Sequence, residues 1–128
     1  MASLSDAEWE VMNILWTGGE MTLGEIREKL RETGNRWAGN TVQTFLARLE
    51  KKGAVGVSRG KLPYRYGAAK PREHYEREVL EDLKQRVFRG SGLRMVSSFM
   101  QLEPMSREDL AALRRVIDES FGEEDAPC

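Results

Sequence analysis

The stretch Ala38–Ala68, AGNTVQTFLARLEKKGAVGVSRGKLPYRYGA, begins with a helical pattern and ends with a strand pattern. Its first half carries four apolar residues at the i, i+3, i+4, i+7 spacing of a helix with one buried face: Val42, Phe45, Leu46 and Leu49. Gly53 ends that helix. The second half predicts strands over residues 54–59 and 62–68, joined by a tight turn at Gly60-Lys61. The stretch therefore predicts a helix followed by a two-stranded hairpin.

Two shorter helices are expected before this stretch. Ser5-Asp6-Ala7-Glu8 and Thr22-Leu23-Gly24-Glu25 both have the spacing of a capping box, which satisfies backbone amides at a helix start. Trp9 and Trp16 share a face of the first helix, so core packing is expected for both. Met21-Thr22 is a candidate third strand. Three helices and then a hairpin, within about 65 residues, is the element order of a winged helix-turn-helix.

The chain is helical again after Pro71, with three amphipathic segments. We predict a mainly α fold with a small β-hairpin: a winged helix-turn-helix domain over residues 1–70, a three-helix dimerisation domain over 71–122 and an acidic tail over 123–128. About 58 residues are marginal for an independent core, so a homodimer is expected. The expected dimer interface consists of Tyr75, Val79, Leu83, Val87, Leu93, Val96, Phe99, Leu110, Leu113 and Ile117.

Composition excludes several classes of protein. Hydrophobic residues make up 40% and charged residues 32% of the 128, and no apolar run approaches the roughly 18 residues that span a bilayer. A folded, soluble, cytoplasmic protein is therefore expected. Cys128 and His74 are each the only residue of their type, so neither a metal site, a cofactor nor a Cys-His nucleophile is expected. Glu81 and Asp82 point to different helix faces, which argues against an enzyme that uses paired carboxylates.

Charge is distributed unevenly along the chain. The net charge is -1, but residues 36–70 contain eight basic residues against one acidic residue, whereas residues 71–128 contain nine basic and thirteen acidic residues. A basic middle indicates a polyanionic partner, and an acidic end indicates protein or water.

The exposed face of the helix in Ala38–Ala68 has side chains that suit the DNA major groove. Asn40, Thr41, Gln43 and Thr44 are candidate base contacts, since amide and hydroxyl groups match base edges. Candidate phosphate contacts on this helix and on the hairpin are Arg48, Lys51, Lys52, Arg59, Lys61 and Arg65. Two simpler interpretations remain open: polar residues opposite an apolar stripe are typical of any surface helix, and hairpin charges also protect an edge strand. A winged-helix module that binds protein is the alternative, and it predicts binding insensitive to salt.

Two stretches resemble one known family. Leu4–Trp16, LSDAEWEVMNILW, together with Trp37 and Thr41–Gly53, TVQTFLARLEKKG, closely resemble the penicillinase and methicillin-resistance repressors, a family that includes copper-responsive members. The resemblance extends through Tyr64-Arg65-Tyr66 and Phe88–Phe99, and it implies a homodimer that binds double-stranded operator DNA with dyad symmetry and represses antibiotic-resistance genes.

The sequence also departs from the family pattern at several positions. Ala38-Gly39 replaces the usual Ser-Pro, which predicts a weaker helix cap, and Asn40 replaces a common lysine, which predicts a different operator. Inducible members are inactivated when a membrane sensor metalloprotease leads to cleavage at an Asn-Phe bond. The matching bond here is Ser98-Phe99, and a dimer-core role for Phe99 is the simpler interpretation. A single cysteine predicts no copper sensing.

Overall fold

A computed structural model of the chain describes residues 3–121 and shows two compact units, with the boundary between Asp82 and Leu83. The predicted acidic tail, 123–128, lies outside the described residues. The two units are described separately below.

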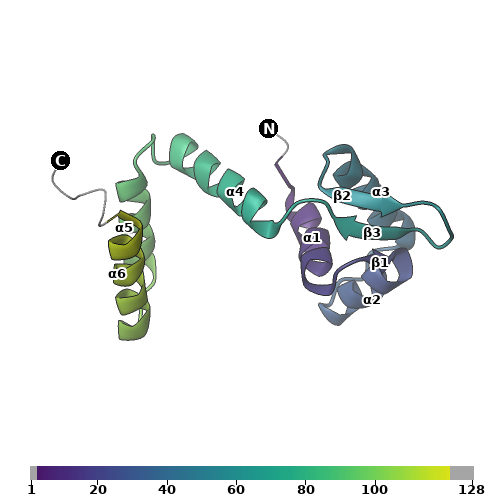
Figure 1. The fold of residues 1–128 in the computed structure, drawn as a ribbon, viewed down its shortest axis with the longest axis horizontal. Coiled ribbons are helices and arrows are strands. Elements are labelled where there is room, and N and C mark those ends of the chain that lie inside the picture. The colour runs from purple at the N-terminus through teal and green to yellow at the C-terminus, as the bar shows by residue number, and fades with distance from the viewer. Residues whose placement is uncertain (1–2, 122–128) are drawn as a thin grey trace. The chain divides into compact units, whose positions relative to one another are not determined.

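The N-terminal unit consists of three helices and a small sheet (Figure 1). In chain order its elements are α1 (Asp6–Gly18), β1 (Met21–Thr22), α2 (Leu23–Glu32), α3 (Gly39–Lys51), β2 (Val55–Ser58) and β3 (Arg65–Ala68), followed by the first part of α4 (Arg72–Arg86). The sheet is antiparallel in the order β1-β3-β2, and Tyr66 of β3 faces both Met21 and Val57. This is a winged helix-turn-helix, and the expected third strand is confirmed.

Local sequence explains where the first two helices begin. The Glu8 amide donates to the Ser5 hydroxyl at 3.2 Å, and the Ser5 amide donates to the Glu8 carboxylate at 2.8 Å. Thr22 and Glu25 repeat this arrangement at α2. Both capping boxes are thus confirmed. Helix α3 instead begins after Ala38, which makes no side-chain capping bond, as its sequence predicts.

The core of this unit lies between the helices and the sheet. Val42, Leu46 and Leu49 of α3 are fully buried, so the periodicity of the helical stripe is confirmed at these positions. Phe45 is only partly buried and packs on Trp37, with ring centroids 5.0 Å apart. The remaining buried apolar side chains are Val11, Met12, Leu15, Met21, Ile26, Leu30, Ala54, Val55, Tyr66 and Tyr75. Trp9 and Trp16 pack against this core edge to face, with centroids 5.5 Å apart, as expected.

The hairpin differs from its prediction. A tight turn at Gly60-Lys61 was expected, but β2 ends at Ser58 and β3 starts at Arg65, so residues 59–64 form a six-residue connection. Pro63 has no amide to donate to a ladder, which accounts for the late start of β3. Tyr64 therefore lies in the connection, while Tyr66 enters the core.

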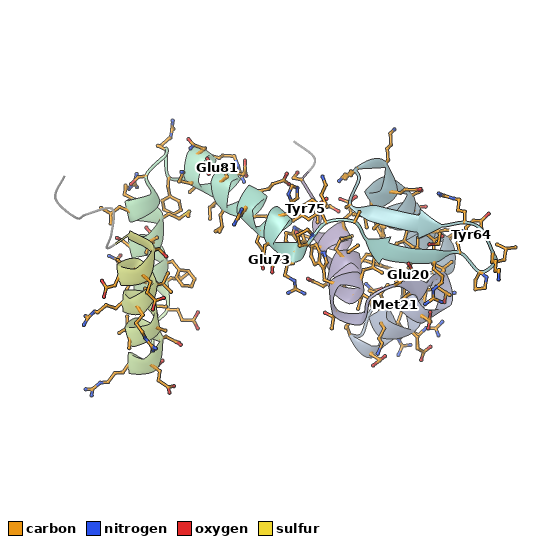
Figure 2. The ribbon with its side chains drawn as sticks, in the orientation of Figure 1. Glu20, Met21, Tyr64, Glu73, Tyr75 and Glu81 are labelled. Carbon is orange, nitrogen blue, oxygen red and sulfur yellow. The ribbon has the colours of Figure 1, made fainter. Side chains whose placement is uncertain are left out.

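The start of α4 belongs to the N-terminal unit, although the sequence placed a domain boundary at residue 70. Tyr75, labelled on α4 in Figure 2, is only 3% exposed. Its ring lies 6.0 Å from that of Trp16 in α1. The Trp16 indole donates to the carbonyl of Lys70 at 2.8 Å. Burial in its own unit leaves almost no surface of Tyr75 for a partner, whereas the sequence places this residue in the expected dimer interface.

The C-terminal unit contains the end of α4, then α5 (Gly92–Leu102) and α6 (Arg107–Phe121). Ser91 caps α5 and the Ser106 hydroxyl accepts from the Asp109 amide at the start of α6. Among the described side chains of α5 and α6, none is buried. Over residues 3–121, no helix combines the length and the hydropathy that a membrane crossing requires.

Candidate nucleic-acid interface

The face of α3 opposite the core is polar and exposed. Asn40, Gln43 and Thr44 are exposed, and Thr41 is half-buried. The Thr44 hydroxyl donates to the Asn40 carbonyl at 2.9 Å, so its oxygen remains available as an acceptor. The structure thus brings the four predicted base-reading residues together in the first turns of one helix. Their amides and hydroxyls provide the donors and acceptors that major-groove recognition uses.

The start of α3 is electropositive. No side chain caps it and its first turn holds no acidic residue, so the positive end of the helix dipole is not compensated there. Arg27 of α2 lies against it: a Cβ at Gly39 would be 3.1 Å from the Arg27 Nη1. The Arg27 Nε is buried without a hydrogen-bond partner in the described part of the chain. This arrangement suits an anion, and sequence reasoning missed Arg27 because nothing in the local pattern links it to Gly39.

Lys52 is half-buried and is paired within its own chain. Its ammonium donates to the Glu8 carboxylate at 2.6 Å and to the Ser3 carbonyl at 2.9 Å. Burial alone raises the pKa of Glu8, but hydrogen bonds from Lys52 and Ser5 outweigh it, and the pKa is lowered below 4.5. This ion pair joins the end of α3 to the start of α1.

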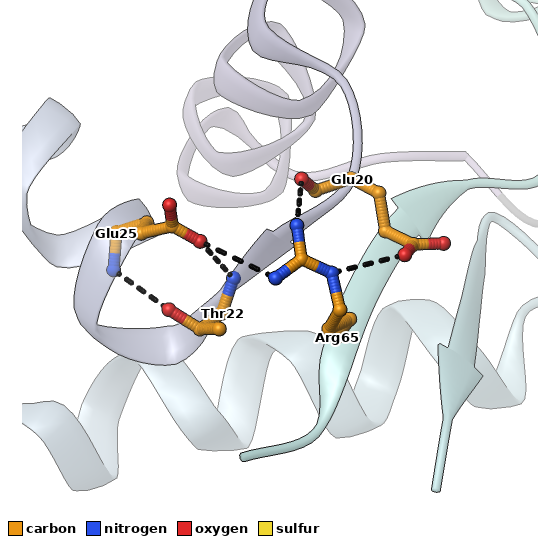
Figure 3. Close-up of polar contacts among 4 residues, drawn as sticks. All are labelled: Glu20, Thr22, Glu25 and Arg65. Atoms are coloured by element: carbon orange, nitrogen blue, oxygen red, sulfur yellow. Dashed lines mark hydrogen bonds and ion pairs between the residues drawn. The ribbon is translucent and has the colours of Figure 1, made fainter. Parts of the chain in front are cut away.

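Arg65 is also paired with carboxylates of its own chain, those of Glu20, just before β1, and of Glu25 in α2 (Figure 3). Its Nε donates to the Glu20 carboxylate and its Nη2 to the Glu20 carbonyl, both at 3.1 Å. Its Nη1 lies 3.9 Å from the carboxylate of Glu25. The hydrogen bonds from Thr22 lower the pKa of Glu25, and the charge of Arg65 adds to this.

Arg59 is engaged by Glu50 of α3. Its two terminal nitrogens donate to the two carboxylate oxygens of Glu50 at 2.6 and 2.7 Å, and its guanidinium lies 5.8 Å from the ring centroid of Tyr64. Three of the six predicted phosphate contacts are therefore paired with carboxylates of their own chain.

The other three predicted phosphate contacts are more available. Arg48, Lys51 and Lys61 are exposed and have no ion pair within residues 3–121. Arg48 lies over the ring of Phe45, 5.9 Å from its centroid. Two of the three residues are on α3 and one is on the hairpin connection.

Apolar side chains are also exposed on α4 and, separately, on the helices of the C-terminal unit. Among the predicted interface residues, Leu83 and Leu113 are half-buried, and seven are between 41% and 79% exposed: Val79, Val87, Leu93, Val96, Phe99, Leu110 and Ile117. Leu80, Leu102 and Val116 are 52%, 82% and 55% exposed, and they are not among the interface residues expected from the sequence. The sequence does not reveal that these side chains are exposed, because the same apolar spacing occurs in helices that bury their apolar face within one chain.

Comparison with known proteins shows similarity over nearly the whole chain. A family model described as the penicillinase repressor matches residues 4–119. The methicillin resistance regulatory protein MecI of Staphylococcus aureus (strain N315) is 25% identical over 115 residues, 90% of this chain and 93% of that protein. The penicillinase repressor of Bacillus licheniformis is 28% identical over 116 residues, 91% of this chain and 90% of that protein.

Two solved structures resemble the N-terminal unit. The DNA binding domain of the repressor BlaI superposes with a TM-score of 0.50 at 33% identity, over 56% of this chain and 87% of that one. Bacillus licheniformis BlaI, in monomeric form in complex with the blaP half-operator, superposes with a TM-score of 0.50 at 32% identity, over 58% of this chain and 89% of that one.

Proposed function

The chain belongs to the penicillinase repressor family, and from this premise we propose that it is a transcriptional repressor that binds operator DNA through α3. The observation that carries the proposal is the exposed polar face of α3 next to an uncapped, cationic helix start. The likeness to a BlaI structure in complex with a half-operator supports the same role. The family is one of repressors, so we propose no catalytic activity.

Each part of α3 has its own role in this proposal. Asn40, Thr41, Gln43 and Thr44 read base edges, whereas Arg48 and Lys51 contact phosphates and fix the register of the helix. Arg27 adds positive charge where α3 begins, and phosphates are favoured at helix N-termini.

We further propose that the repressor is a homodimer that binds a palindromic operator. The exposed apolar residues of α5 and α6 support this, because such a surface marks an interaction site. Two α3 helices on half-sites about one DNA turn apart would multiply the weak affinity of a single winged helix.

We propose that the repressor acts in the cytoplasm and controls antibiotic-resistance or related stress genes. The names of two relatives, a methicillin resistance regulatory protein and a penicillinase repressor, support resistance genes as its targets. A membrane sensor metalloprotease is the inactivating partner that the resemblance implies, with cleavage at Ser98-Phe99. Both residues are exposed on α5 of the single chain. Phe99 is also an expected dimer-interface residue, so a role in the dimer core remains the simpler interpretation.

The test is selection of bound fragments from genomic DNA at two salt concentrations, with wild type, Gln43→Ala and Gln101→Ala. Gln101 is exposed on α5, so it provides a control with the same chemical change. We expect a short palindrome whose affinity falls as salt rises and falls a further ~10- to 100-fold in Gln43→Ala alone. Failure to enrich any palindrome, with binding insensitive to salt, would point instead to a winged helix that binds a protein.

A further inference from the structure

The Glu50–Arg59 ion pair joins the last turns of α3 to the connection between β2 and β3. Its two parallel hydrogen bonds, 2.6 and 2.7 Å long, give the fork geometry that only arginine provides. The bond from Arg59 lowers the pKa of Glu50 and raises that of Arg59, so both groups remain charged across the ordinary pH range. The ring of Tyr64, at the far end of the connection, lies against the same guanidinium.

The orientation of this guanidinium matters for DNA binding. Both terminal nitrogens of Arg59 point to Glu50, so a phosphate at these nitrogens would have to displace a carboxylate. The geometry therefore favours Arg59 as the ion-pair partner of Glu50 over a direct phosphate contact.

Lys61 is in the opposite situation. It lies in the same six-residue connection, two residues after Arg59, and is exposed without an ion pair in the described part of the chain. Arg65, the other arginine of the hairpin, is held by Glu20. Among the basic residues of the hairpin, Lys61 can therefore contact a phosphate without first breaking an ion pair.

We propose that Arg59 is a positioning residue, which ties residues 59–64 to α3. Lys61, in the same connection, then makes the phosphate contact of the hairpin. This rests on the proposed DNA binding and makes it more specific. It reassigns one of the phosphate contacts expected from the sequence, since Arg59 acts through Glu50 and Lys61 acts on DNA.

The first test is the salt dependence of operator binding for Lys61→Gln, Arg59→Gln and Arg59→Lys. Lys61→Gln should reduce the slope of log K against log salt by about 0.9, the value of one phosphate contact. Arg59→Gln should weaken binding by about threefold at every salt concentration, within the range of an exposed ion pair, and leave the slope unchanged. Arg59→Lys keeps the charge but not the fork, so we expect most of the same loss.

The opposite pattern would overturn the proposal. If Arg59→Lys binds like wild type while Arg59→Gln loses about 0.9 in slope, Arg59 contacts phosphate directly. An unchanged slope in Lys61→Gln would equally remove Lys61 from the interface. Melting temperatures of the variants verify that each one is folded, and little change is expected because the pair is partly exposed.

A second test needs no DNA. Hydrogen exchange of the amides of residues 59–62 and 64 is compared between wild type, Glu50→Gln and Glu28→Gln. Glu28 forms an exposed pair with Arg31 within α2 and provides the control. Faster exchange of residues 59–64 in Glu50→Gln alone supports the tie, and unchanged exchange contradicts it. A wild type that binds no operator would refute the proposed function while this test still decides on the tie.

Discussion

The two units of this chain differ in how they cover their apolar residues. The N-terminal unit buries apolar side chains from α1, α2, α3, the sheet and the start of α4, and eight of its larger side chains are less than 2% exposed. In α5 and α6 no described side chain is buried, and Leu102 is 82% exposed. Both regions have amphipathic helices, so helix patterning alone does not produce a core.

The difference follows from the number of layers. In the N-terminal unit, three helices pack on each other and on a sheet, so each apolar stripe has a facing element. Two helices can cover each other on only one side, and about 45 residues bury too small a fraction of their surface for a stable core. The apolar surface of the C-terminal unit is therefore the place where a second chain would complete the fold.

Removing a core side chain should reveal the difference between the two units most clearly, as a loss of stability. Leu46→Ala should lower the free energy of unfolding by about 4 kcal/mol, because Leu46 is 1% exposed and its loss leaves a cavity. Leu93→Ala is the same chemical change at a residue that is 79% exposed, and should cost less than about 0.5 kcal/mol in dilute protein. Denaturant unfolding at low concentration measures both, and equal losses would contradict the comparison.

The buried ion pair of the N-terminal unit should give the next largest effect. Lys52→Met leaves the Glu8 carboxylate, only 3% exposed, without its cation, and should cost about 3 kcal/mol at pH 7. Since the pKa of Glu8 is lowered, its ionised form stabilises the fold above pH 4.5, and this contribution is lost as pH falls through the lowered value. The difference between variant and wild type should therefore shrink below pH 4.5.

Lys51→Met is the matched control for this prediction. Lys51 is the neighbouring residue, is exposed and has no ion pair in the described residues, so its loss should hardly change unfolding at any pH. If Lys52→Met is as stable as Lys51→Met, the Glu8–Lys52 pair does not join α1 to α3.

A charge on the apolar surface of the C-terminal unit should leave the N-terminal core intact and abolish dimerisation. Val96→Asp should lower the affinity for a full palindrome by about 100-fold, because each winged helix then binds alone. Its affinity for a single half-site should be unchanged. Gln101→Asp adds the same charge at an exposed polar position of α5 and should leave both affinities as they are. Sedimentation gives the oligomeric state, and a dimeric Val96→Asp variant would refute the proposed interface.

Much of the N-terminal unit was predictable from neighbouring residues. Its two capping boxes act over three residues, and the apolar stripe of α3 recurs over three and four residues, so the sequence carries both directly. The hairpin was only partly predictable: the strands were expected, but the length of the 59–64 connection depends on where the ladder with β2 ends. The burial of Tyr75 was not predictable, because its apolar stripe continues along α4 to Val79 and Leu83, while its packing partner, Trp16, lies in α1.

The sequence by itself determined the order of the elements, the helix starts and the exposed polar face of α3, because these depend on residues within about one helical turn of each other. The tertiary structure alone decided which basic residues remain available to DNA. Lys52 meets Glu8 across 44 residues of chain, and Arg65 meets Glu20 across 45. A count of charges along the chain gives the same weight to every cation, whereas folding neutralises those that it brings against carboxylates and leaves the others exposed.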